Sequence, residues 1–251
     1  MLTVEENQML TQTGPGTPMG ELFRRFWLPV MLAEEIPSAD CVPKRLRILS
    51  EDLIAFRDSN GEVGIIDAYC PHRGAPLFFG RNEECGLRCV YHGWKFDVNG
   101  VCVDLPNSPE GETYKDKVTI KAYPGIEKGG VIWAYMGPLD KKPPLPHLGF
   151  MDVPASHRYV WRMEIECNYF QSMEGDFDSS HVNFLHSVLG DVRSNPTVRH
   201  RGNDPAVLAG TVPQYVHVRD TEYGVGQVTV VKRADGTQTV NTGNWLMPCF
   251  T

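Results

Sequence analysis

The chain has 251 residues, of which 41% are hydrophobic and 22% charged, and its formal net charge is −7. This composition is typical of a globular protein of one or two domains with a sizeable core. The negative charge gives no electrostatic support to binding of nucleic acid or of an anionic membrane. No apolar run approaches the roughly 18 residues of a membrane-spanning helix. The polar start shows no signal peptide, and seven cysteines scattered without a disulfide framework favour a reducing cytoplasm.

Two helix starts open the chain. Thr3-Val4-Glu5-Glu6 has the pattern of a capping box, and Thr17-Pro18 puts proline at the first position of a helix. The second helix is predicted to direct Leu22, Phe23 and Phe26 towards a core. Residues 1–26 are therefore predicted to form an N-terminal helical segment.

Short β-rich runs follow, at residues 45–49, 53–57, 63–66, 118–122 and 131–135. Turn signals at residues 58–61 and at Asn99-Gly100 separate some of them. They predict a small all-β domain over residues 27–138, ending at a proline-rich linker (140–146). In residues 139–251 the pattern predicts a strand at 159–166, a helix at 168–186 and strands at 211–219, 226–233 and 239–247. The predicted fold class is α+β, with an antiparallel sheet in the second domain.

Two mixed pairs of cysteine and histidine lie in the predicted β domain. One pair is Cys70-x-His72 and the other is Cys89-x-x-His92, with 16 residues between His72 and Cys89. Two thiolates on one iron and two imidazoles on the other are the ligand set of one type of [2Fe–2S] cluster. A glycine follows each pair and allows a tight turn. A structural zinc site is the alternative, although zinc sites more often use Cys-x-x-Cys pairs.

A second candidate site lies in residues 168–186. On a helix, a polar stripe would share one face, formed by Asn168, Gln171, Glu174, Asp178 and His181, and His186 follows five residues later. A solvated face is the ordinary explanation of such a stripe. However, residues 163–192 contain six carboxylates and no Lys or Arg, whereas solvated faces normally mix both signs. The stripe therefore indicates a metal site, with non-haem iron as the favoured metal.

Together, the two sites resemble those of the Rieske non-haem iron aromatic ring-hydroxylating oxygenases, in their large (alpha) subunit. Asp178-x-x-His181-x-x-x-x-His186 is similar to the mononuclear iron motif of that family, and residues 3–20 look like its phthalate dioxygenase-type branch. The resemblance covers essentially the whole chain. Respiratory Rieske proteins have a disulfide where this chain has Ala75 and Tyr91, so the resemblance is to the lower-potential centres of oxygenases and their ferredoxins.

The resemblance implies a role for each candidate residue. The small β domain would be a Rieske domain whose cluster is held by Cys70, His72, Cys89 and His92. Fe(II) would be bound by His181 and His186, as two ligands of a 2-His-1-carboxylate triad. Asp178 would link an iron-binding histidine to a cluster histidine of a neighbouring subunit, with Asn168 and Glu174 near the site.

The implied function is that of a terminal oxygenase component. Electrons from NAD(P)H would arrive through a separate reductase, directly or by way of a ferredoxin, and O2 would hydroxylate an aromatic, carboxylated substrate. The resemblance implies a homotrimer or a dimer of trimers. The third iron ligand is expected about a hundred residues or more beyond His186, where only 65 residues follow, so we expect an incomplete catalytic domain in a longer subunit.

Two other functions stay open at this point. One is a Rieske electron-transfer protein without oxygenase activity, and the other is an O-demethylating monooxygenase of the same family. A carboxylated substrate would need a cation in its pocket, for which the candidates are Arg193, Arg199, Arg201, Lys232 and Arg233. Asn241, in the strand before Trp245, stands where a phthalate-type enzyme might place a basic residue.

Overall fold

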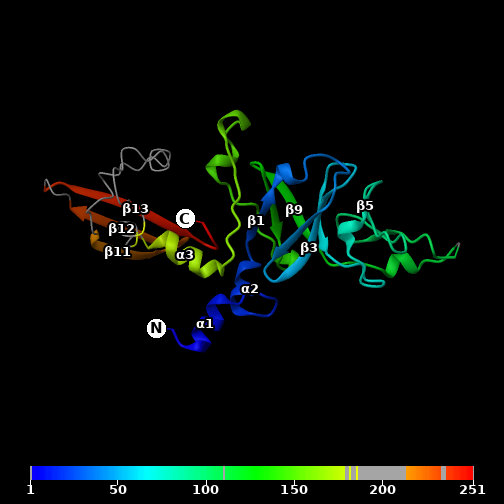
Figure 1. Cartoon of the computed structure of the whole chain (residues 1–251), viewed down its shortest axis with the longest axis horizontal. Coiled ribbons are helices and arrows are strands. Elements are labelled where there is room, and N and C mark those ends of the chain that lie inside the picture. The colour runs from blue at the N-terminus through cyan, green and yellow to red at the C-terminus, as the bar shows by residue number, and fades with distance from the viewer. Residues whose placement is uncertain are drawn as a thin grey trace. The chain divides into compact units, whose positions relative to one another are not determined.

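The computed structural model describes residues 2–109, 111–178, 181, 185, 213–232 and 236–250. The chain forms two compact units, Met1–Ile165 and Glu166–Thr251 (Figure 1). The irregular residues that follow Pro138 have their contacts in the first unit. The predicted domain limits at residues 26 and 138 stay a prediction.

Both predicted N-terminal helices are present. In α1 (Val4–Thr11) the capping box is complete, because Thr3 Oγ1 accepts from the Glu6 amide and Glu6 Oε2 accepts from the Thr3 amide. The helix α2 (Pro18–Phe23) begins at Thr17, whose hydroxyl accepts from the Gly20 amide. Of the three side chains predicted to reach a core, Phe23 is buried, whereas Leu22 is exposed and Phe26 is half-buried.

An antiparallel six-stranded sheet forms the body of the first unit, in the order β1-β10-β9-β4-β3-β2. Its strands are β1 (Trp27–Leu32), β2 (Lys44–Ile48), β3 (Glu51–Arg57), β4 (Val63–Asp67), β9 (Ala122–Lys128) and β10 (Val131–Tyr135). The turn at residues 58–61 joins β3 to β4, and the left-handed φ of Gly61 (83°) closes it. The strand predicted at 118–122 is wrong, because this stretch only begins β9 at Ala122 and otherwise contributes one bridge, Thr119 to Val101.

A second sheet of four short strands lies against this body. The strands are β5 (Arg81–Asn82), β6 (Leu87–Arg88), β7 (Lys95–Phe96) and β8 (Cys102–Asp104). One cluster of buried side chains packs the two sheets together, and it includes Phe56, Ile66, Leu77, Leu87, Cys89 and Phe96. Short 3₁₀ helices occur at η1 (Ala33–Glu35), η2 (Leu77–Phe79), η3 (Tyr114–Lys117), η4 (Leu139–Lys141), η5 (Gly149–Met151) and η6 (Ala155–His157).

The described part of the second unit contains one helix, α3 (Tyr169–Phe177), and one antiparallel sheet in the order β11-β12-β13. Its strands are β11 (Pro213–Thr221), β12 (Gly224–Lys232) and β13 (Gln238–Leu246), near the predicted positions. Helices and antiparallel sheets together confirm the α+β class. No helix in the described parts of the chain is long and apolar enough to cross a membrane.

The strand predicted at residues 159–166 is wrong. This stretch has no regular secondary structure, and its alternating apolar side chains are exposed, with Tyr159, Trp161 and Met163 between 62% and 87% accessible. A period-two pattern forms a strand only where a neighbouring strand accepts its hydrogen bonds. Within the described residues, none pairs with this segment.

Candidate metal centres

The two predicted ligand loops have the same main-chain design. In the first loop, the Cys70 amide donates to Ala75 O (2.9 Å) and the Gly74 amide donates to Cys70 O (2.9 Å). The second loop repeats both bonds, from Cys89 to Trp94 O (2.8 Å) and from Gly93 to Cys89 O (3.0 Å). Gly74 and Gly93 have φ of 67° and 79°, a region that favours glycine. Each tight turn therefore needs its glycine, as the sequence predicts.

The loops bring two thiols and two imidazoles together. Cys70 and Cys89 are buried, and the rings of His72 and His92 lie 4.5 Å apart between centroids. Burial raises the pKa of the Cys70 thiol to about 11, with a further contribution from Cys89, and the main-chain amides of His72 and Arg73 oppose this rise. A thiol that is so hard to ionise by itself suits a site where bound metal supplies the compensating positive charge.

His72 is held in a form that suits a metal ligand. Its ring stacks on Trp94 at 4.4 Å with an angle of 5° between the planes. Burial lowers the pKa of His72, and the nearby charges of His92 and Arg73 lower it further, which favours the neutral imidazole. Its Nδ1 is buried and has no hydrogen-bond partner in the described structure. A buried nitrogen without a partner is costly unless it binds something, and neutral imidazole is the form that binds metals.

The four donors match, in type and number, a [2Fe–2S] cluster that takes two protein ligands at each iron. Cys70, His72, Cys89 and His92 are therefore the residues that would hold such a cluster.

The predicted helix of the second site is shorter than expected. Asn168 caps its start by accepting from the Phe170 amide (3.0 Å), and the helix ends at Phe177. Asp178 has extended backbone angles (φ −85°, ψ 103°), so the helical face proposed for the whole stripe stops at Glu174. The predicted helix is therefore interrupted at Asp178, and of residues 179–186 the structure describes only His181 and Leu185.

A cavity of about 750 Å³ lies in the second unit. Three predicted site residues, Glu174, Asp178 and His181, line it together with Gln171, Met173, Gly175, Phe177, Val225 and Trp245. Met173 and Phe177 form apolar walls of this cavity. Gln227 Nε2 donates to Phe177 O (2.7 Å) and so attaches the end of α3 to β12.

Sequence reasoning missed two residues of this cavity, Val225 and Trp245. They face each other across β12 and β13, and nothing local in the sequence relates them to His181. His186 lies outside the described residues, as do four of the five candidate cations, Arg193, Arg199, Arg201 and Arg233. The remaining one, Lys232, is exposed at the end of β12 and is absent from the described lining of the cavity.

Comparison with known proteins gives consistent matches. Residues 26–124 match the family model of the Rieske [2Fe-2S] domain. Over 248 residues the chain is 44% identical to the 3-chlorobenzoate-3,4-dioxygenase oxygenase subunit of Comamonas testosteroni, covering 99% of this chain and 56% of that protein. Over 187 residues it is 44% identical to the phthalate 4,5-dioxygenase oxygenase subunit of Pseudomonas putida, covering 74% and 43%. The chain thus spans about half the length of these relatives.

A similar solved structure is the reduced complex between oxygenase and ferredoxin in carbazole 1,9a-dioxygenase. The TM-score is 0.58 at 25% sequence identity, and the match covers 83% of this chain and 53% of that one.

Proposed function

The chain belongs to the Rieske non-haem iron oxygenases, in the branch of phthalate dioxygenase-type large subunits, and on this basis we propose that it acts in a terminal oxygenase that hydroxylates an aromatic, carboxylated substrate. The observation that supports this most strongly is the pair of ligand loops, with two buried thiols and the unpartnered Nδ1 of His72. Relatives named for chlorobenzoate and phthalate support a carboxylated ring as the substrate.

In this proposal the first unit binds the cluster. Cys70 and Cys89 hold one iron as thiolates, and His72 and His92 hold the other through ring nitrogens. When bound, the cluster supplies transfer of single electrons, and Fe(II) at His181 and His186 supplies activation of O2 beside the substrate. Trp94 fixes the plane of the His72 ring by stacking on it.

The second unit binds the substrate and orients the iron ligands. Met173, Phe177 and Trp245 offer apolar and aromatic walls to a ring in the cavity that His181 also lines. Asp178 accepts N–H bonds from an iron-binding imidazole and from a cluster histidine of a neighbouring subunit, which fixes both rings. Asn168 contributes by capping α3, and Glu174 by lining the cavity.

The proposed partners follow from the roles proposed for the two units. A reductase, directly or through a ferredoxin, delivers electrons to the first unit, and the solved oxygenase–ferredoxin complex of similar fold supports such a partner. A trimer, or a dimer of trimers, would provide the neighbouring subunit that the Asp178 link requires.

Metal analysis of the subunit tests the proposal. We expect three irons per subunit, one of which is lost in His181→Ala while the visible spectrum of the cluster stays unchanged. Two irons, with no effect of His181→Ala, would instead indicate an electron carrier without oxygenase activity. The substrate class is tested by identifying products from a panel of benzoates and phthalates against the matching uncharged arenes, because the proposal requires hydroxylation of the acids.

A further inference from the structure

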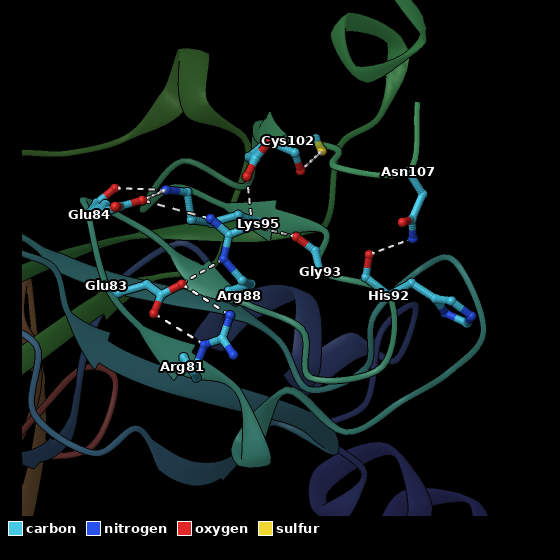
Figure 2. A network of polar contacts seen from close by, with 10 residues as sticks. Arg81, Glu83, Glu84, Arg88, His92, Gly93, Lys95, Cys102 and Asn107 are labelled. Atoms are coloured by element: carbon cyan, nitrogen blue, oxygen red, sulfur yellow. Dashed lines mark hydrogen bonds and ion pairs between the residues drawn. The ribbon is translucent and has the colours of Figure 1, made fainter. Parts of the chain in front are cut away.

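Arg88 lies directly before the proposed cluster ligand Cys89, and its side chain is 12% exposed. Its Nε donates to Glu83 Oε1 (2.6 Å), and its Nη1 donates to Asp104 Oδ2 (2.6 Å) and to Gly93 O (2.8 Å). Figure 2 shows this guanidinium between Glu83 and the main chain at Gly93. The Arg88 guanidinium therefore binds three separate parts of the unit, which are the segment after β5, the strand β8 and the second ligand loop.

A second side chain holds the same loop. Asn107 Nδ2 donates to His92 O (2.9 Å), and Figure 2 shows this bond reaching the loop from outside it. The main-chain carbonyls of His92 and Gly93 are thus both occupied by side chains that belong to other segments. The loop is confined further by Pro106, because a Cβ added to Gly93 would meet Pro106 Cγ at 2.6 Å.

The first ligand loop is held differently. In the described structure, no side chain from another segment donates to a carbonyl of residues 70–76, and the bonds of that loop are its own main-chain turns. His72 is instead positioned by the stacking of its ring on Trp94. The two imidazoles are therefore fixed by different means, one through its ring and the other through its backbone.

We propose that Arg88 and Asn107 are positioning residues for His92. Their hydrogen bonds to the Gly93 and His92 carbonyls hold the second ligand loop in place, and so determine how the His92 imidazole is oriented towards the cluster and how firmly the cluster is retained. This inference rests on the proposed function, because it assumes that His92 is a ligand. Removal of a residue that hydrogen-bonds to a metal ligand without touching the metal typically changes metal affinity by about 10–100-fold.

The chain offers a matched control for the charge of Arg88. Arg81 lies opposite Arg88 in the β5–β6 ladder and also binds Glu83, through Nε at 3.2 Å. Its side chain is 65% exposed, and it makes no bond to the ligand loop. Arg81→Gln therefore removes the same charge and a bond to the same carboxylate, and leaves the loop carbonyls unchanged.

The test uses the cluster-loaded full chain in four variants, Arg88→Gln, Arg88→Lys, Asn107→Ala and Arg81→Gln. Two readouts are followed, which are the rate of cluster bleaching by an iron chelator and the EPR spectrum of the dithionite-reduced protein. We expect bleaching about tenfold faster in Arg88→Gln, with broadened EPR lines. Arg88→Lys should behave similarly, because an ammonium cannot span the three acceptors as a planar guanidinium does.

Asn107→Ala should show a smaller change in the same direction, and Arg81→Gln should match wild type. The inference is overturned if the Arg88 variants and Asn107→Ala all bleach at the rate of Arg81→Gln with its EPR spectrum. Should the Arg88 variants fail to fold, Asn107→Ala decides alone, because its side chain is exposed and its loss spares the core. Wild-type protein without a Rieske spectrum would contradict the proposed function instead, so the two failures are distinguishable.

Discussion

Glu51 is the centre of a buried charge cluster whose removal we expect to be strongly destabilising. Its carboxylate lies 2.7 Å from Arg24 Nη2 and 2.7 Å from Lys121 Nζ, and it accepts from Tyr123 OH at 2.8 Å. Glu51 and Arg24 are both under 10% exposed. The cluster joins the end of α2 to β3 and to the segment that enters β9, so it connects three separated parts of the first unit.

The expected loss follows from the charge that would be left behind. Glu51→Gln leaves the Arg24 guanidinium buried without its counter-charge, and breaking a buried pair in this way typically costs about 3–5 kcal/mol. Arg24 keeps three carbonyl acceptors, at Thr13, Gly20 and Leu49. These bonds satisfy three of its five N–H groups, so we expect about 3 kcal/mol, the lower end of that range.

Urea denaturation of the cluster-loaded protein, followed by tryptophan fluorescence, measures this loss. The control is Asp52→Asn, in the same strand, because Asp52 pairs with Arg47 at 2.7 Å while both side chains are 47–69% exposed. An exposed pair is worth about 0–1 kcal/mol. A midpoint for Glu51→Gln equal to that of Asp52→Asn would refute the reasoning. The double variant Arg24→Met/Glu51→Met should recover part of the loss, since it leaves no unpaired charge.

Three further outcomes are expected. Burial raises the pKa of Glu51, but hydrogen bonds from Lys121, Arg24 and Tyr123 outweigh it and hold the pKa below its usual value. The stabilisation that comes from this lowered pKa is present at neutral pH and is lost as the pH falls below about 4.3. The difference in urea midpoint between wild type and Glu51→Gln should therefore narrow on acidification, and a widening difference would contradict this reasoning. Gly64→Ala puts a Cβ into the buried Phe56 ring and should cost about 1–3 kcal/mol in the same assay, whereas Gly149→Ala, with open space around its Cβ, should be neutral. Asp178→Asn should keep both metal centres and nearly abolish electron transfer from cluster to iron in single-turnover absorption measurements; unchanged turnover would exclude the proposed link.

The ligand loops could be predicted from sequence because their design is local. Each cysteine, histidine and glycine of a loop lies within five residues of the others, and the closing hydrogen bonds also join residues within that span. The helix starts at Thr3 and Thr17 and the turn at Gly61 were predictable for the same reason, since caps and turns are satisfied by near neighbours.

The sequence predicted which residues gather at the second site, but not how they are brought together. Glu174, Asp178 and His181 do line one cavity, but the helix ends at Phe177, so helical periodicity does not bring Asp178 and His181 there. A run of polar residues carries no local signal for where its helix must stop, because that depends on packing against β12, to which Gln227 anchors the last helical carbonyl.

By itself, the sequence determined the donor set and the loop turns, because each depends on residue types at short spacing. Only the tertiary structure decided which distant groups meet. Trp245 reaches the cavity through the register of β13 on β12, Asp104 reaches Arg88 through the sheet of short strands, and Glu51 meets Lys121 across 70 residues. Such contacts follow from strand order and register, which depend on the packing of the whole unit and not on any local pattern.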